Sequence, residues 1–183
     1  VNFTAASSSV KKGETLADTV RNILAMKVDM VVMRHPHPGA AHYLATKIDV
    51  PIINAGDGTH EHPTQALLDC FTLTERLGHL SGKRVCIFGD IRHSGVALSN
   101  VRCLKLLGAE VMVCGPATLI PKHFVSLGVA VEHDMDRALE WCDVANVLRI
   151  QLERQGSEVP FFPSLEEYHD RFGLTSERLD RLS

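Results

Sequence analysis

The chain has 183 residues, of which 45% are hydrophobic, and its formal net charge is -3. That length suits one large domain or two small ones, and the hydrophobic share is enough to form a buried core. A slightly acidic chain offers no general attraction to nucleic acid or to an acidic membrane surface, and no apolar run is long enough to span a membrane. We therefore expect no nucleic-acid partner and no membrane association.

The five cysteines are odd in number, form no Cys-x-x-Cys pair and lie mostly in apolar strand or helix patterns. This pattern favours buried, reduced thiols and a cytoplasmic location. The chain opens on Val1 without an initiator methionine, and we expect it to be an excerpt of a longer protein.

Apolar periodicity predicts an alternation of helices and strands along the chain. Before a boundary at 81–83, the pattern predicts helices over 16–27, 39–47 and 63–77, and buried strands over 30–33 and 51–54. After it, the pattern predicts strands over 84–88, 110–114, 129–132 and 144–148, and helices over 96–107, 122–127, 136–142, 165–172 and 175–182. Such alternation predicts an α/β fold of two doubly wound parallel-sheet lobes joined by the helix after His62, with lobes at 1–77 and 82–183.

The stretch 51–69 runs from a short apolar strand through a glycine-containing loop directly into a helix. Pro63 suits the first turn of that helix, so His62, Thr64 and Gln65 gather at its N-terminus. Free backbone N–H groups and the helix dipole attract anions and polarised carbonyl oxygens to such a point. We expect a ligand site here.

Polar residues follow three predicted strands: Arg34, then His62 with Gln65, then Arg149 with Gln151. Open α/β sheets bind ligands at the carboxyl ends of their strands, and arginine suits carboxylates and phosphates. An anionic substrate is therefore indicated. Each signal alone also fits a plainer role: a surface ion pair for an arginine, a structural role for a loop histidine, and a solvated loop for Gln151.

Other kinds of site have weaker support. His60 and His62 with Asp57 and Glu61 could ligate a metal, but no third cluster stands out. The strand at 84–88 ends in Gly89, yet the spacing is not that of a dinucleotide fingerprint. The serines at 7–9 have no partner base nearby in sequence, so a serine nucleophile is not supported.

Together these stretches resemble the catalytic chain of aspartate carbamoyltransferase, in the family's order and over nearly the whole chain. The matching segments lie at 8–16, 33–36, 54–58, 62–69, 89–91 and 148–154. The resemblance implies a carbamoyl-phosphate lobe followed by an aspartate lobe. It also implies a homotrimer with shared active sites, with a possible regulatory or dihydroorotase partner and without a metal or cofactor.

The resemblance also assigns roles to residues. Arg34, His62 and Gln65 would contact carbamoyl phosphate, and Arg34 and His62 would stabilise the oxyanion formed as the α-amine of aspartate attacks. Lys12, and Ser8 with it, would reach into the neighbouring subunit's site.

Arg149 and Gln151 would hold the aspartate carboxylates. The product would be N-carbamoyl-L-aspartate, for pyrimidine biosynthesis.

The sequence departs from the family pattern at Gly95, where the family carries an arginine that grips aspartate. Arg92 lies close enough in sequence to be a substitute. The family's Ser-Thr-Arg-Thr-Arg phosphate loop and its later proline–leucine loop are also absent from the chain, and we expect this fragment alone to be inactive. The alternative hypothesis is a non-catalytic homologue that acts as a trimeric scaffold.

Overall fold

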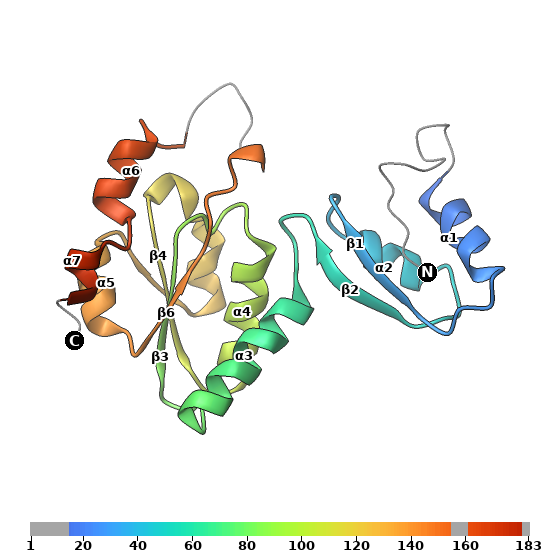
Figure 1. Cartoon of the computed structure of the whole chain (residues 1–183), viewed down its shortest axis with the longest axis horizontal. Helices are drawn as coiled ribbons and strands as arrows, with labels where there is room; N and C mark the ends of the chain where they lie inside the picture. The colour runs from blue at the N-terminus through green and yellow to red at the C-terminus, as the bar shows by residue number, and fades with distance from the viewer. Residues whose placement is uncertain (1–14, 155–160, 181–183) are drawn as a thin grey trace.

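The computed structural model describes residues 15–154 and 161–180. Its helices and strands alternate along the chain, as the sequence pattern predicts (Figure 1). In chain order they are α1 (Leu16–Leu24), β1 (Val31–His35), α2 (Ala40–Ala45), β2 (Ile52–Asp57), α3 (Pro63–Leu77), β3 (Arg84–Phe88), α4 (Gly95–Leu106), β4 (Glu110–Cys114), η3 (Ala117–Leu119), η4 (Lys122–Leu127), β5 (Ala130–Glu132), α5 (Met135–Trp141), β6 (Val144–Val147), η5 (Leu152–Arg154), α6 (Leu165–Phe172) and α7 (Ser176–Asp180).

The first lobe contains a parallel pair of strands, β1 and β2, in which Val31 lies opposite Ile52 and Met33 opposite Asn54. One face of this pair is covered, because side chains of α1 and α2 form a single buried cluster with Met33. Val32 and Ile53 point to the other face and are exposed, as expected for residues next to buried ones along a strand.

The second lobe is a four-stranded parallel sheet in the order β5-β4-β3-β6. Buried residues of β3 and β4 contact α4 and α3 on one face, and a second cluster packs α5 against the other face. β3 is central and covered on both sides, which is why its sequence, Arg-Val-Cys-Ile-Phe, is almost continuously apolar. This is the doubly wound α/β arrangement that the sequence predicts.

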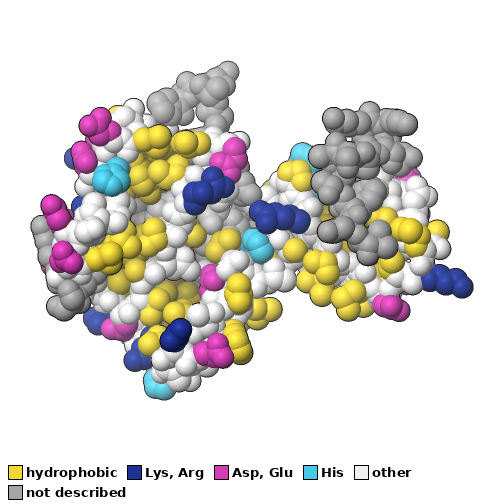
Figure 2. Space-filling model, in the orientation of Figure 1, with side chains coloured by type: hydrophobic (Ala, Val, Ile, Leu, Met, Phe, Trp, Pro, Cys, Tyr) yellow, Lys and Arg dark blue, Asp and Glu magenta, His cyan; other side chains and the backbone are white. Residues whose placement is uncertain are grey.

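Helix α3 links the two lobes. It follows β2 in sequence, yet its Cys70 belongs to the apolar cluster of the second sheet, and it packs along α4. Figure 1 shows α3 running from the junction of the lobes along the second sheet. Leu67, Leu68 and Phe71 are exposed on its outward side, where Figure 2 shows hydrophobic side chains at the surface. The lobe boundaries at 77 and 82 stay a prediction.

Several boundaries differ from the sequence-based ones for local reasons. The first helix ends at Leu24 rather than 27, and Lys27 takes a positive φ of 58°. β1 continues through Arg34 to His35, and β2 continues to Asp57, because parallel pairing with the neighbouring strand extends past the apolar run. Capping side chains also mark helix starts that periodicity misses, such as Ser94, whose hydroxyl accepts a hydrogen bond from the N–H of Ala97.

The five cysteines are free thiols, and burial raises the pKa of Cys114 to about 12. Among the helices that the structure describes, none has the length and apolarity needed to cross a membrane.

Helix α4 offers a matched test of the second core. Leu104 is 2% exposed and lies in the core cluster, whereas Leu106 on the same helix is 87% exposed. We expect Leu104→Ala to lower the free energy of unfolding by about 2–5 kcal/mol, and Leu106→Ala by no more than about 0.5 kcal/mol. Urea unfolding followed by circular dichroism measures both, and equal losses would contradict the placement of α4.

Candidate functional site

The centre of the candidate site is the start of α3. His62 is the N-cap residue of this helix, and its ring Nδ1 accepts a hydrogen bond from the backbone N–H of Gln65 at 3.3 Å. Pro63 occupies the first helical position, where its missing N–H costs nothing. The sequence therefore folds locally so that an imidazole ring stands at the positive end of a 15-residue helix.

This cap determines which ring nitrogen of His62 can donate. A backbone N–H can only donate, so Nδ1 must be the acceptor, and the proton of the neutral ring is on Nε2. Burial of the ring, together with the nearby positive charge of Arg34, lowers the pKa of His62 below its usual value of 6.5. His62 is thus a neutral hydrogen-bond donor through Nε2 near neutral pH.

Arg34 and His62 line the same small pocket. Its other walls are His35, Pro36, Gly56 and Gly58, and its volume is about 250 Å³, which suits a small ligand. Arg34 comes from β1 and His62 follows β2, so parallel pairing of these strands brings both to the same end of the sheet. A cation and a neutral N–H donor at a helix N-terminus can bind an anion that carries a carbonyl oxygen.

Two glycines let the backbone approach this pocket closely. A Cβ at Gly56 would lie 3.1 Å from Cδ2 of His62, so the missing side chain leaves room for the imidazole ring. A Cβ at Gly58 would lie 2.3 Å from the carbonyl oxygen of Pro36, and its φ is +67°. A side chain at position 56 would press on the His62 ring, and one at position 58 would push apart the two loops that form the pocket.

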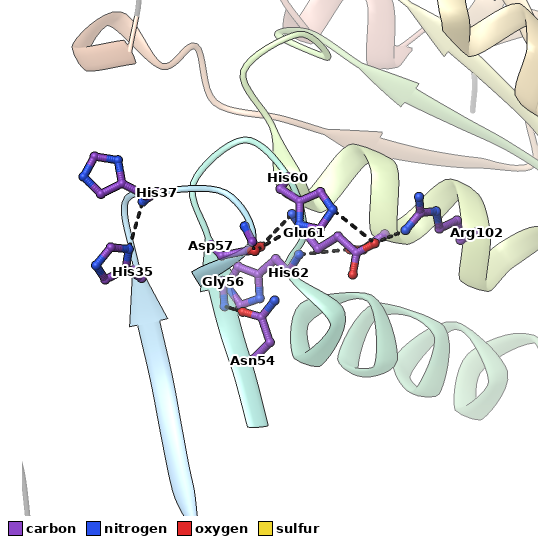
Figure 3. Close-up of polar contacts among 11 residues, drawn as sticks. His35, His37, Asn54, Gly56, Asp57, His60, Glu61, His62 and Arg102 are labelled. Atoms are coloured by element: carbon purple, nitrogen blue, oxygen red, sulfur yellow. Dashed lines mark hydrogen bonds and ion pairs between the residues drawn. The ribbon is translucent and has the colours of Figure 1, made fainter. Parts of the chain in front are cut away.

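Asp57 connects those loops through its carboxylate, which Figure 3 shows beside His60 and Glu61. Its carboxylate accepts hydrogen bonds from the N–H of Gly39, at 2.7 Å, and from that of Glu61, at 3.0 Å, and it contacts Nδ1 of His60 at 2.9 Å. Burial acts to raise the pKa of Asp57, but hydrogen bonds from His60 and Asn54 outweigh it, and the pKa is lowered. The sequence suggested Asp57 only as a metal ligand, whereas in the structure it is a buried carboxylate that joins two loops by hydrogen bonds.

The second lobe also holds the loop before α3. The N–H of His62 donates to the hydroxyl of Ser99 on α4 at 2.9 Å, and Arg102 on α4 forms an ion pair with Glu61. The first residue of α4, Gly95, packs against the Glu61 backbone, to which a Cβ would approach within 3.0 Å. No sequence motif pointed to Ser99 or Arg102, because both contacts join segments about 40 residues apart.

The other expected site residues lie outside this pocket. The Gln65 amide donates to Asp69 on the next turn of α3. Arg149 is exposed and pairs with Glu153, and the backbone N–H of Gln151 donates to Asp90 at 3.2 Å. The structure therefore brings Arg34 and His62 together but not Arg149 with them. Figure 2 shows Lys or Arg side chains on both sides of the junction between the lobes.

The remaining expectations divide between described and undescribed residues. The guanidinium of Arg92 lies over the ring of Phe161, 5.3 Å from its centre. Ser8 and Lys12 lie outside the described residues. In the described part of the chain, no group of three or more His, Cys, Asp or Glu side chains is arranged to hold a metal ion.

Comparison with known proteins agrees with this geometry. The family model described as "Aspartate/ornithine carbamoyltransferase, carbamoyl-P binding domain" matches residues 1–75, which include Arg34 and His62. The aspartate carbamoyltransferase catalytic subunit of Cytophaga hutchinsonii is 65% identical over 183 residues, and that of Christiangramia forsetii is 64% identical over 182. Over its whole length the chain is similar to the catalytic subunits of aspartate carbamoyltransferases. These matches cover 100% of this chain but only 59% and 58% of the two relatives.

Solved structures show the same α/β transcarbamylase fold. Aspartate transcarbamoylase from Trypanosoma cruzi, in complex with aspartate and phosphate, matches with a TM-score of 0.74 and 34% identity. That match covers 85% of this chain and 54% of the other. The same enzyme in complex with carbamoyl aspartate and phosphate also gives a TM-score of 0.74, at 35% identity, covering 84% and 54%.

The lowered pKa of His62 leads to a pH-dependent stability. Between that lowered pKa and 6.5 the unfolded chain binds more protons than the folded one, so the contribution of His62 is complete above pH 6.5 and is lost as the pH falls through this interval. Asparagine caps helices but does not titrate. We expect the wild-type free energy of unfolding to fall more steeply than that of His62→Asn below pH 6.5 in urea titrations; parallel curves would contradict the assignment.

Proposed function

We propose that the full-length protein transfers the carbamoyl group of carbamoyl phosphate to the α-amine of L-aspartate, giving N-carbamoyl-L-aspartate and phosphate. The observation that carries the proposal is that Arg34 and His62, whose Nδ1 caps α3, line one pocket at the start of that helix. The bound ligands of the Trypanosoma cruzi enzyme, carbamoyl phosphate and aspartate among them, support the same substrates here.

Carbamoyl transfer requires hydrogen-bond donors at the carbonyl oxygen, and this pocket contains two donor side chains. Attack of the aspartate amine on the carbamoyl carbon places negative charge on the carbonyl oxygen, and donors aimed at that oxygen stabilise the transition state. His62 Nε2–H and the Arg34 guanidinium would supply them. The C–O bond to phosphate then breaks, phosphate leaves with the electron pair and the amine loses a proton. The step requires no covalent enzyme intermediate, metal or cofactor.

In this proposal each lobe binds one of the two substrates. Residues 1–77 would bind carbamoyl phosphate, with Gln65 contacting the carbamoyl group, and residues 82–183 would bind aspartate. Arg149 and Gln151 would hold the aspartate carboxylates, which requires Arg149 to exchange its partner Glu153 for the substrate. That exchange is accessible, because the Arg149 side chain is 70% exposed and an exposed ion pair contributes little stability.

Assembly completes the site in the same proposal. Ser8 and Lys12 of one subunit would reach the pocket of the next in a cytoplasmic homotrimer. A regulatory chain or a dihydroorotase partner would attach outside the trimer. The apolar residues exposed on α3, Leu67 and Phe71 among them, are compatible with further contacts in the full-length protein.

Turnover by the full-length protein tests the proposal. We expect carbamoyl aspartate to form from the two substrates, and His62→Ala to lower kcat about a hundred- to a thousand-fold, the effect of removing one oxyanion donor. His123→Ala removes an exposed histidine of the second lobe and is the matched control, with no expected change. A wild-type protein that binds neither carbamoyl phosphate nor aspartate would defeat the proposal.

The second candidate function is a non-catalytic trimeric scaffold, and Gly95 favours it. Glycine at this position removes the arginine that the resemblance assigns to aspartate binding. The backbone of Glu61, against which Gly95 packs, is held by hydrogen bonds to Asp57 through both its N–H and its carbonyl group. A side chain at position 95 would therefore clash with a Glu61 backbone that these hydrogen bonds hold in place.

Two substitutions at position 95 separate the candidates. If the protein is an enzyme, we expect Gly95→Arg to lower the KM for aspartate about tenfold or more, since a charge-assisted contact contributes about 1.5–3 kcal/mol. Gly95→Ala adds the Cβ without the guanidinium, so it measures the effect of crowding against Glu61 alone. Steady-state assays that show no gain for Gly95→Arg over Gly95→Ala would favour the scaffold.

A further inference from the structure

The side of α4 that faces the loop before α3 carries three contacts at helical spacing. Gly95, Ser99 and Arg102 are four and three residues apart, so they lie on one side of the helix. Gly95 packs against the backbone of Glu61, and the Ser99 hydroxyl accepts a hydrogen bond from the N–H of His62 at 2.9 Å. Arg102 pairs with the Glu61 carboxylate (Figure 3). One side of α4 therefore contacts the two residues that lead into α3.

The Arg102 contact differs in kind from the other two. The packing of Gly95 and the hydrogen bond of Ser99 exist only while α4 is already close to the loop, whereas opposite charges attract over longer distances. Among the residues that the structure describes, the pair of Arg102 with Glu61 is the one ion pair between the two lobes. Nε2 of His60 is 4.0 Å from the same carboxylate oxygen, too far for a hydrogen bond, so Arg102 is the main partner of Glu61.

Glu61 transmits the position of α4 to His62, the next residue in the chain. The Glu61 backbone is fixed within its own loop, because its N–H donates to the Asp57 carboxylate at 3.0 Å and its carbonyl accepts from the Asp57 N–H at 2.9 Å. Loss of the Arg102 charge would leave these bonds intact and remove only the attraction to α4. The hydrogen bond from the His62 N–H to Ser99, which needs α4 close by, would then weaken.

We propose that Arg102 is a positioning residue for carbamoyl transfer: by holding Glu61 against α4, it fixes where the His62 imidazole lies at the start of α3. This rests on the function proposed above and adds to it a residue that does not line the pocket. Arg102 touches no substrate. A slightly displaced catalytic group loses much of its effect on the transition state while ground-state binding changes little, so the role of Arg102 affects kcat more than affinity.

Kinetics of the full-length protein measure this role. We expect Arg102→Ala to lower kcat about tenfold and to leave the Kd of carbamoyl phosphate within about twofold of the wild type. Glu61→Gln should cause the same loss, and the double variant should be no slower than either single variant, because both changes remove one interaction. Arg137→Ala removes another exposed arginine that is paired with a carboxylate, Asp134, and is the matched control that should change neither quantity.

Hydrogen exchange distinguishes positioning by α4 from a general loosening of the loop, and it does not depend on turnover. In Arg102→Ala the N–H of His62, which is bonded to Ser99 on α4, should exchange about tenfold faster than in the wild type. The N–H of Glu61, which is bonded to Asp57 within the loop, should exchange at the wild-type rate. Faster exchange of both N–H groups, or of neither, would overturn the inference.

The outcomes also distinguish this inference from the proposed function. A wild-type protein that catalyses no carbamoyl transfer would defeat the proposed function, and the exchange rates would still decide whether Arg102 fixes the His62 backbone. An active wild type whose kcat is unchanged in Arg102→Ala, or a double variant in which the two losses multiply, would overturn only the role of Arg102.

Discussion

The hydrogen bond between the His62 ring and the first turn of α3 is the contact on which the rest of the site depends. It makes one side chain serve both the fold and the proposed chemistry, since capping the helix uses Nδ1 as an acceptor and leaves a proton on Nε2. The lowered pKa keeps that arrangement near neutral pH. A protonated ring could not accept at Nδ1, so loss of the cap and loss of the neutral donor would occur together.

Contacts of the surrounding loop fix the position of the His62 ring. Gly56 leaves room for the ring, Ser99 binds the His62 backbone, and Asp57 connects the loop to the turn before α2. These supports come from both lobes, so the position of His62 depends on how α4 lies against the loop. Arg34 lies in β1 between Met33 and His35, which pair with β2 on either side of a register shift, so the strand pair brings it to the same end of the sheet.

The sequence predicts the parts of this structure that local patterns govern. Alternating apolar periodicities give the order of helices and strands, and Pro63 locates the start of α3 and hence His62. The sequence could not predict that Asp57 joins two loops by hydrogen bonds, because a buried structural carboxylate and a metal ligand cannot be distinguished in sequence. Nor could it predict Asp69, whose partners Asn100 and Asn146 come from elements 31 and 77 residues away.

Gly95 affects both the packing that supports the site and the aspartate binding proposed for it. The closeness of α4 to Glu61 positions Ser99 for the His62 backbone, and glycine is the residue that permits that closeness. In the proposed function an arginine there would add a cation for aspartate, but it would also press on the loop that holds His62. Displacement of the proposed oxyanion donor would then lower kcat even as the KM for aspartate falls, unless α4 shifts. The lobes of this chain are therefore coupled through one packed backbone contact, and position 95 cannot be considered apart from His62.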